Sequence, residues 1–376
     1  MLSSGDIRRS YIDFYTRRGH TAIPGGSLIG DDTVLFTSAG MQPLVPYFSG
    51  APHPSGRRLV NAQRCLRTVD IDEVGDDTHL TCFEMLGSWS LGDYFKRESL
   101  GWTLEWLLAL GIEREALDVT VYPGDVEAER RWRDFGIERI TELEDNWWGP
   151  PGLHGPCGPD SEIFHDGVEL GNNVFIVHEQ TPDGTLRALP QRNVDVGMGL
   201  ERITCLLQGV ESVYDTDLFT EIRGRVRALT STPDTRPERI VCDHVRSGVF
   251  LIAEGVLPSN NAHGYVLRRL LRRAIRQGRR LGIEGPFLGE VGESVTDDPR
   301  VLEVLESEER RFARTLQRGL REIERLDHVD GRVLHRLFET YGLPPELTLE
   351  ELGTELDWRQ EFDEAREEHR RRSRAA

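Results

Sequence analysis

The sequence predicts an α+β protein in which an antiparallel sheet flanked by helices is followed by an all-helical domain. Two observations predict this fold class. In the first part of the chain, short apolar runs alternate with glycine and proline turns, as in strands joined by tight connections. In the second part, almost every segment repeats its apolar residues with helical period. The pattern changes at a polar, proline-rich stretch at 231–239, so we expect domains at 1–230 and 237–376.

The first domain begins with an amphipathic helix at 6–18, where apolar side chains recur at helical spacing. Residues 33–40 (TVLFTSAG) predict a strand that runs into a turn, and residues 79–85 (HLTCFEM) predict a second strand. The aromatic-rich segment 99–112 predicts a helix.

An antiparallel meander is expected next. A proline- and glycine-rich loop at 149–159 is followed by two strand-like segments, SEIFHDG and NNVFIVHEQ. The sequence TPDG at 181–184 is a turn signal before a further strand. Beyond the boundary, the segments 243–256, 264–278 and 301–326 have helical periodicity and predict the helices of the second domain.

The composition describes an acidic, well-hydrated chain. Its 376 residues carry 46 basic and 64 acidic side chains, a net charge of −18, so a surface that binds a polyanion would have to be local. No run of about 18 apolar residues and no signal peptide occurs, and we expect a cytoplasmic protein with no membrane partner. Without CxxC or HxxxH spacing, neither a disulfide framework nor a zinc site is predicted.

Lysine is almost absent, which excludes one class of nucleotide site. Lys96 is the single lysine and follows phenylalanine, so the Gly-Lys pair of a P-loop does not occur. If the protein holds phosphate, arginine must do it. QRCLR at 63–67 places Arg67 on a predicted strand beside an acidic loop, where it could face a phosphate; simple exposure is the alternative.

The sharpest local signal is VDVGMGLERI at 194–203. It is not a dinucleotide fingerprint, because Arg202 occupies the sixth position of GMGLER and no βαβ unit surrounds it. Gly197 and Gly199 would let a flat ligand lie against the backbone, and Arg202 can stack on a ring or hold a phosphate. The alternative is a turn with a solvated arginine.

In this order, the segments resemble those of the alanyl-tRNA synthetases, a family of class II aminoacyl-tRNA synthetases. The resemblance covers nearly the whole chain, and its segments are FTSAGM, QRCLR, FEMLGSWSLGDYF, NWW, GPCGP with SEIF, VDVGMGLERI, VYDTDLF, DHVRS and LPSNNAHGYVLRRLLRRAIRQG. It implies a class II catalytic domain at 1–230 and a helical domain for the tRNA acceptor stem at 237–376. The implied activity is ATP-dependent activation of alanine, or a similarly small amino acid, and transfer to the 3′ end of tRNA.

The resemblance also implies site residues. Arg67 and Arg202 match arginines on the ATP phosphates, and Asp195 matches the carboxylate that pairs with the substrate ammonium; these three are the expected catalytic residues. Guanidiniums would stabilise charge as it moves to pyrophosphate. The ATP site is completed by Met41, Phe83, Met85 and Gly199, and the amino-acid site by Trp148, Asn173 and Gly197. We expect Mg²⁺ with the ATP and Glu162 as its ligand, the alternative being a polar pair in the core.

The arginine-rich helix at 264–282 is predicted to contact RNA phosphates, because no acidic residue occurs between 255 and 282. Pairing of its arginines with the acidic helix at 303–326 is the alternative. By resemblance, Asn260 and Glu339 read the acceptor-stem wobble pair. The expected tRNA-binding residues are Asn260, Arg268, Arg269, Arg272, Arg273, Arg276 and Glu339.

Three points stay open at this stage. Asp160, Asn172 and Val177 depart from the family's pattern, so the preferred small amino acid is undecided. The family's editing and C-terminal domains do not follow here, so we expect no editing in cis and a deacylase in trans as a further partner. The competing functions are a paralogue that delivers the activated amino acid to another acceptor and a non-catalytic tRNA-binding module.

Overall fold

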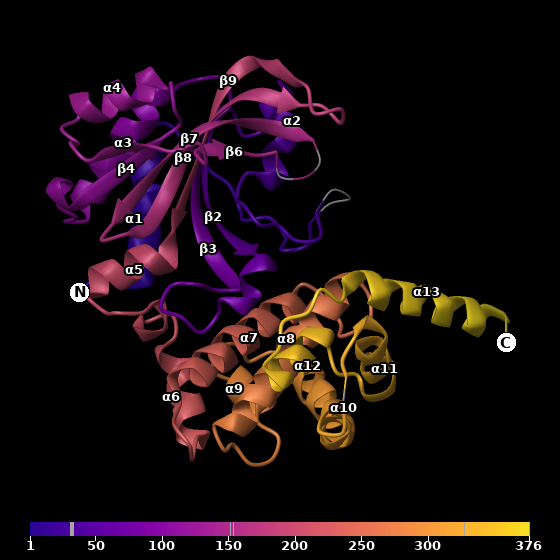
Figure 1. Cartoon of the computed structure of the whole chain (residues 1–376). Helices are drawn as coiled ribbons and strands as arrows, with labels where there is room; N and C mark the ends of the chain where they lie inside the picture. The colour runs from indigo at the N-terminus through magenta and orange to yellow at the C-terminus, as the bar shows by residue number, and fades with distance from the viewer. Residues whose placement is uncertain (31–33, 151, 153, 327, 376) are drawn as a thin grey trace. The chain divides into compact units, whose positions relative to one another are not determined.

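The computed structural model describes residues 1–30, 34–150, 152, 154–326 and 328–375. These residues divide into two compact units, Met1–Gly224 and Arg225–Ala376, and each is described by itself (Figure 1). The division lies a few residues before the predicted linker. That linker is partly helical, since helix α7 begins at Thr235, and a proline in the first turn of a helix, here Pro237, is tolerated.

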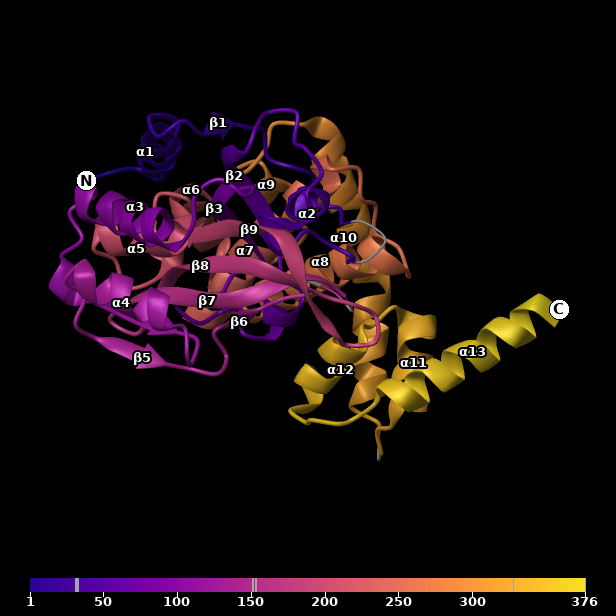
Figure 2. The ribbon, with the colours of Figure 1, turned by 90° about the horizontal axis from the view of Figure 1, so that it is seen from above.

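The first unit is built on a mixed sheet whose central strands are antiparallel, which confirms the predicted fold class. The described residues form nine strands in the order β1-β2-β3-β9-β8-β7-β4-β5, with β6 paired to β7, and Figure 2 shows β3, β9, β8 and β7 side by side. Only the β1–β2 and β4–β5 pairs are parallel. The strands are β1 (Thr21–Ala22), β2 (Arg58–Leu66), β3 (Cys82–Ser90), β4 (Leu117–Val121), β5 (Ile140–Glu142), β6 (Trp147–Trp148), β7 (Gly155–His165), β8 (Val168–Gln180) and β9 (Leu186–Gly199).

The helices of this unit cover the sheet. Helices α1, α3 and α5 pack on the central strands, and α2 contacts β7 and β9. Their bounds are α1 (Ser4–Thr16), α2 (Val45–Phe48), α3 (Lys96–Ala109), α4 (Val126–Asp134) and α5 (Leu200–Gln208), with short 3₁₀ segments at Gln42–Leu44, Val69–Asp72, Arg114–Ala116 and Val213–Asp215. Helix α6 (Thr220–Leu229) begins in this unit and ends in the second. Lys96 is buried at the start of α3 and pairs with Asp125 at the cap of α4, so the single lysine is used inside the fold.

Two separate cores lie on the two faces of the sheet, because successive side chains of a strand point in opposite directions. Leu86, Val196 and Met198 belong to the core shared with α1 and α3. Trp89 on β3 and Val174 on β8, the two strands that flank β9, belong to a smaller core on the other face. The second face also carries the candidate site.

Three predicted elements of this unit have different bounds. Residues 34–40 form no strand, and Phe36 makes only an isolated bridge to Ile29; residue 33 lies outside the described residues. The strand predicted at 79–85 begins only at Cys82, because the preceding residues form a turn that is hydrogen-bonded to Asp76. Strand β7 begins at Gly155, inside the predicted loop at 149–159.

The described part of the second unit is helical, as predicted. Its helices are α7 (Thr235–Ala253), α8 (Ala262–Arg280), α9 (Leu288–Gly292), α10 (Pro299–Ile323), α11 (Gly331–Tyr341), α12 (Pro345–Leu352) and α13 (Arg359–Ala375). Helices α7 and α8 approach closely at Gly248, where a Cβ atom would lie 2.8 Å from a methyl carbon of Leu271. A search of the described helices finds none that is long and apolar enough to cross a membrane.

Candidate active site

A cavity in the first unit collects six of the residues that the sequence predicted. It is an open hollow of about 590 Å³, counting the solvent-filled space at its mouth. Strands β3, β8 and β9 supply its floor, and the turn before β3 and the start of α5 supply its walls. The six predicted residues are Arg67, Phe83, Met85, Gly197, Gly199 and Arg202.

Strand register brings the floor residues together. Met85 on β3 lies opposite Gly199 on β9, and Asn172 on β8 lies opposite Gly197. At Gly197, a Cβ atom would lie 2.8 Å from the sulfur of Met85, so a side chain there would push the methionine into the cavity. At Gly199, a Cβ atom would make only ordinary contacts of 3.7 Å or more. A small side chain at Gly199 would therefore meet no clash, in contrast to one at Gly197.

The two arginines of the cavity are held by acceptors of the protein. The Nε atom of Arg67 donates to the carbonyl oxygen of Ser38 at 3.2 Å, and its guanidinium lies 5.0 Å from the ring centre of Phe83. The Nη1 atom of Arg202 donates to both the carbonyl and the carboxylate of Glu169, each at 3.0 Å. Because a guanidinium has five N–H donors, these contacts orient both side chains and leave donors for a ligand.

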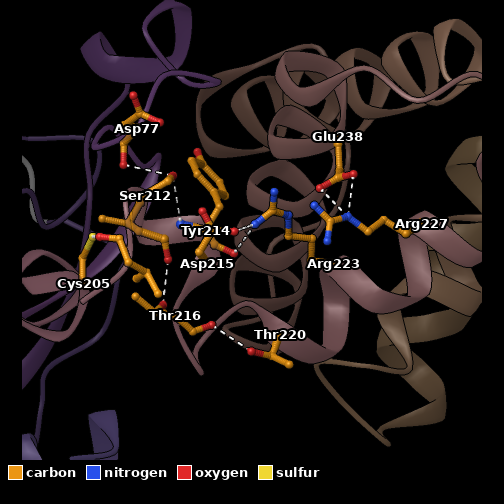
Figure 3. Close-up of polar contacts among 12 residues, drawn as sticks. Asp77, Cys205, Ser212, Tyr214, Asp215, Thr216, Thr220, Arg223, Arg227 and Glu238 are labelled. Atoms are coloured by element: carbon orange, nitrogen blue, oxygen red, sulfur yellow. Dashed lines mark hydrogen bonds and ion pairs between the residues drawn. The ribbon is translucent and has the colours of Figure 1, made fainter. Parts of the chain in front are cut away.

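The turn before β3 is braced from a distant segment. The hydroxyl of Ser212 donates to the carbonyl oxygen of Asp77 at 3.2 Å (Figure 3). The hydroxyl of Tyr214 donates to the carbonyl oxygen of His79 at 2.9 Å, and the His79 ring contacts Asp76. These bonds position the turn residues that line the cavity, which are Thr78, His79 and Leu80.

Asp195 lies in the sheet beneath the two cavities of this face and lines neither of them. Its side chain is only 5% exposed, and it accepts a 2.7 Å hydrogen bond from the indole N–H of Trp89 on the neighbouring strand. Burial raises the pKa of Asp195 to about 7, although the bond from Trp89 opposes this shift. Within the described residues, no basic side chain forms an ion pair with it.

A second, wider cavity adjoins the first, and Arg67 and Asp70 line both. Trp148 forms part of its wall, and its role at the amino-acid site stays a prediction. Met41 is completely buried in the core with Trp89 and lines neither cavity. The prediction that the Met41 side chain walls the ATP site is therefore not met by its position.

Asn173 was predicted to belong to the amino-acid site, but its side chain points to the other face of the sheet. Its side chain is fully buried and accepts hydrogen bonds from the hydroxyls of Ser99 at 2.8 Å and Thr103 at 2.9 Å, both on α3. Alternation along β8 puts Asn173 on the helix-covered face and its neighbour Asn172 on the cavity face. Further lining residues that the sequence did not assign to the site are Asp70, Thr78, His79, Leu80, Glu169, Leu170, Gly171 and Glu201.

Glu162 lies on β7, and its carboxylate accepts a 3.3 Å hydrogen bond from Thr120. Burial, and then the nearby charge of Glu169, raise the pKa of Glu162. The described residues contain no group of three or more acidic, histidine or cysteine side chains placed to hold a metal ion. A magnesium ion that arrives with phosphates needs only one or two carboxylates, and it would relieve the repulsion between Glu162 and Glu169. Glu169 lines the first cavity and already accepts a hydrogen bond from Arg202, whereas Glu162 lines neither cavity. The assignment of Glu162 as a magnesium ligand stays a prediction.

In the second unit, the arginines of α8 from Arg268 to Arg276 have carboxylate partners on other helices. Arg272 and Arg273 are buried, and Arg272 contacts Glu308 of α10 at 2.7 Å and the carbonyl of Gly342. Arg273 contacts Glu350 of α12 at 3.4 Å. These two residues therefore serve internal ion pairs, and the expectation that they meet RNA is corrected.

The other predicted tRNA-binding residues are also partnered. Arg268 contacts Glu308 and donates to Asn260, Arg269 lies 3.8 Å from Glu346, and Arg276 pairs with Glu351. The acids come from α10, as the alternative reading of the sequence proposed, and also from α12. Glu339 is exposed on α11, 3.8 Å from the ring of His335. The reading of the acceptor-stem base pair by Asn260 and Glu339 stays a prediction.

The raised pKa of Asp195 predicts a pH-dependent stability. Because the folded pKa is about 7 and the ordinary value is 3.8, the folded state holds this proton more tightly. Its stabilising contribution is therefore full at acid pH and is lost as pH rises from about 4 to about 7. In urea unfolding, Asp195→Asn should gain stability relative to the wild type across this range and show a constant difference above it.

Asp166→Asn is the matched control, because the Asp166 side chain is 89% exposed. Its difference from the wild type should not change with pH. Asp160, whose pKa burial also raises to about 7, is present in all three proteins and cancels in the comparison. A pH-independent difference for Asp195→Asn would contradict the prediction.

Comparison with known proteins identifies the family. The family model described as "tRNA synthetases class II (A)" matches residues 6–376. The protein named "Alanine--tRNA ligase" of Treponema pallidum is 42% identical over 99% of this chain and 72% of its own length. The protein of the same name from Thermotoga maritima is 43% identical over the whole chain, which spans half of that relative. With its cavity formed by the segments that match, this chain belongs to the class II (A) tRNA synthetases.

Proposed function

We propose that the chain activates alanine, or a similarly small amino acid, with ATP and transfers it to the 3′ end of a tRNA. The observation that carries the proposal is the buried carboxylate of Asp195, which has no ion-pair partner among the described residues and lies on the sheet face that also carries two oriented arginines. The names of the relatives, "Alanine--tRNA ligase", support the choice of amino acid and acceptor.

The substrate ammonium is the ion-pair partner that Asp195 lacks. A carboxylate in a low-dielectric site binds an ammonium strongly, because the same burial that raises its pKa also removes competing water. Binding of the cation would return the carboxyl group to its charged form. Asp195 would then fix the amino acid by its α-ammonium and leave the α-carboxylate free to react.

Arg67 and Arg202 would act on the phosphates. In the activation step, a carboxylate oxygen of the amino acid attacks the α-phosphorus, and the bond from that phosphorus to the bridging oxygen of pyrophosphate breaks. Negative charge grows on the departing group, and guanidiniums that are already oriented stabilise it without reorganisation. When bound, Mg²⁺ would neutralise phosphate charge, with Glu162 and Glu169 as its protein ligands.

In the transfer step, a hydroxyl of the terminal ribose attacks the carbonyl carbon of the adenylate, and AMP leaves. Two competing functions differ at this step. A paralogue with another acceptor would catalyse pyrophosphate exchange but would not charge tRNA. A non-catalytic tRNA-binding module would do neither, and the orientation of Arg67 and Arg202 toward a cavity argues against it.

We predict that Arg202→Ala lowers amino-acid-dependent ATP–pyrophosphate exchange roughly 100-fold, the usual scale for removing one donor aimed at developing charge. Arg139→Ala is the matched control, because Arg139 forms an ion pair with Asp118 at 2.7 Å and lines neither cavity of the sheet face. The control should exchange like the wild type. Equal rates for both variants would contradict the assignment, and the same assay across all amino acids identifies the substrate.

The absence of editing within residues 1–376 stays a prediction. A pocket for alanine cannot strongly reject glycine or serine, since one methyl group or hydroxyl changes selectivity only about 10- to 200-fold. We expect purified chain to leave serine on preloaded tRNA at the uncatalysed rate, as measured without AMP and pyrophosphate. Rapid release of serine would reveal a hydrolytic site in these residues, whereas slow release would leave correction to a deacylase in trans.

A further inference from the structure

The arginines of the second unit fall into two groups that differ in their partners. Those along the inner side of α8 meet glutamates of α10 and α12, as the contacts of Arg272 and Arg276 show. Arg279, at the end of α8, and Arg314, on α10, are exposed. Within the described residues, neither forms an ion pair, and Arg314 donates only to the carbonyl oxygen of Arg310 in its own helix at 3.3 Å.

The residues of the second group meet at a surface cavity. Arg279, Arg310 and Arg314 line it together with Glu309, and its remaining walls are Gly285, Pro286 and Ala313. Helices α8 and α10 pack against each other, and this contact places Arg279 at one hollow with Arg310 and Arg314, which lie more than 30 positions further along the sequence.

The carboxylates near this cavity are already used. Glu309 is only 3% exposed and accepts hydrogen bonds from the backbone N–H groups of Phe287 and Leu288, at 2.8 to 3.1 Å. Glu306 pairs with Arg310 at 2.9 Å. Three guanidiniums therefore face two carboxylates, of which one is turned inward to hold the start of α9.

We propose that this cavity binds the phosphate backbone of an RNA double helix. Guanidinium groups match the geometry of phosphate oxygens and can hold them bidentately, and the apolar walls at Pro286 and Ala313 suit the sugar between two phosphates. Arg318 extends the row, because it follows Arg314 by four positions and lies on the same side of α10. In a chain of net charge −18, this local excess of positive charge, with three guanidiniums against the carboxylates of Glu306 and Glu309, would attract a polyanion.

The proposal rests on the proposed function in that the RNA is taken to be the tRNA acceptor, but it concerns a different surface. It moves the RNA contact from the inner arginines of α8, which the sequence favoured, to the outward arginines at the end of α8 and on α10. Pyrophosphate exchange does not require tRNA in the proposed scheme, so loss of exchange would count against the catalytic proposal only.

The test is the salt dependence of the affinity for a tRNA transcript. Arg279→Gln combined with Arg314→Gln should reduce the slope of log K against log salt by roughly 0.7 to 0.9 for each lost phosphate contact. Exchange activity should stay at the wild-type level. Arg300→Gln is the matched control, since Arg300 is an exposed arginine of the same helix already paired with Asp298 at 2.7 Å, and it should leave the slope unchanged.

Three results would overturn the proposal. An unchanged slope in the double variant would show that these arginines do not meet phosphates. An equal loss in Arg300→Gln would show that only the total charge matters. A competition experiment distinguishes RNA from small anions. If millimolar inorganic phosphate occupies the two arginines as effectively as tRNA does, the cavity is a small-anion site and the RNA assignment fails.

Discussion

The antiparallel register of β3, β9 and β8 decides which side chains reach the candidate site. It sets Met85 opposite Gly199 and Trp89 opposite Asp195, so the cavity floor and the buried carboxylate lie on one face. The helices α1, α3 and α5 occupy the other face, where Val196 and Met198 pack. A shift by one residue would exchange the two faces and would bury the site under the helices.

Burial of the Asp195 carboxyl group is energetically unfavourable in this site. A carboxyl group in an apolar setting loses its hydration, and the single indole bond from Trp89 replaces only part of it. The group therefore keeps its proton in the free protein up to about neutral pH. A bound ammonium would pair with the ionised form of this carboxyl group, so the site favours a cationic substrate. The arginines at the nearby cavity, Arg67 and Arg202, are oriented by protein acceptors and keep further N–H donors for a negatively charged ligand.

Much of the fold was predictable from the sequence, because strand-like runs, turn signals and helical periodicity are local properties. Arg67, Gly197, Gly199 and Arg202 were also recognisable, since glycines and arginines of this spacing have a direct chemical use. The errors have a different origin. Neighbouring asparagines look alike in sequence, and only the pairing of β8 shows that Asn172 faces the cavity and Asn173 faces α3.

The same limit applies to the arginines of α8. Their local segment has no acids, but the glutamates that neutralise them lie far along the chain, as the separation of 36 positions between Arg272 and Glu308 shows. Which arginine pairs with which glutamate is set by the packing of the helices in the folded chain. The turn at His79 is likewise held by Tyr214, more than a hundred positions away, and no local pattern announces that bond.

Proton release on ligand binding tests the role of Asp195 most directly. Calorimetric titration with a non-hydrolysable analogue of the aminoacyl-adenylate at pH 6.5, in two buffers of different ionisation enthalpy, gives the number of protons released. A carboxyl group with a pKa of about 7 is largely protonated at this pH and must ionise to pair with an ammonium, so release on the order of half a proton per site is expected. Asp195→Asn should abolish the release. Binding by the wild type without proton release would contradict the pairing of the substrate ammonium with Asp195.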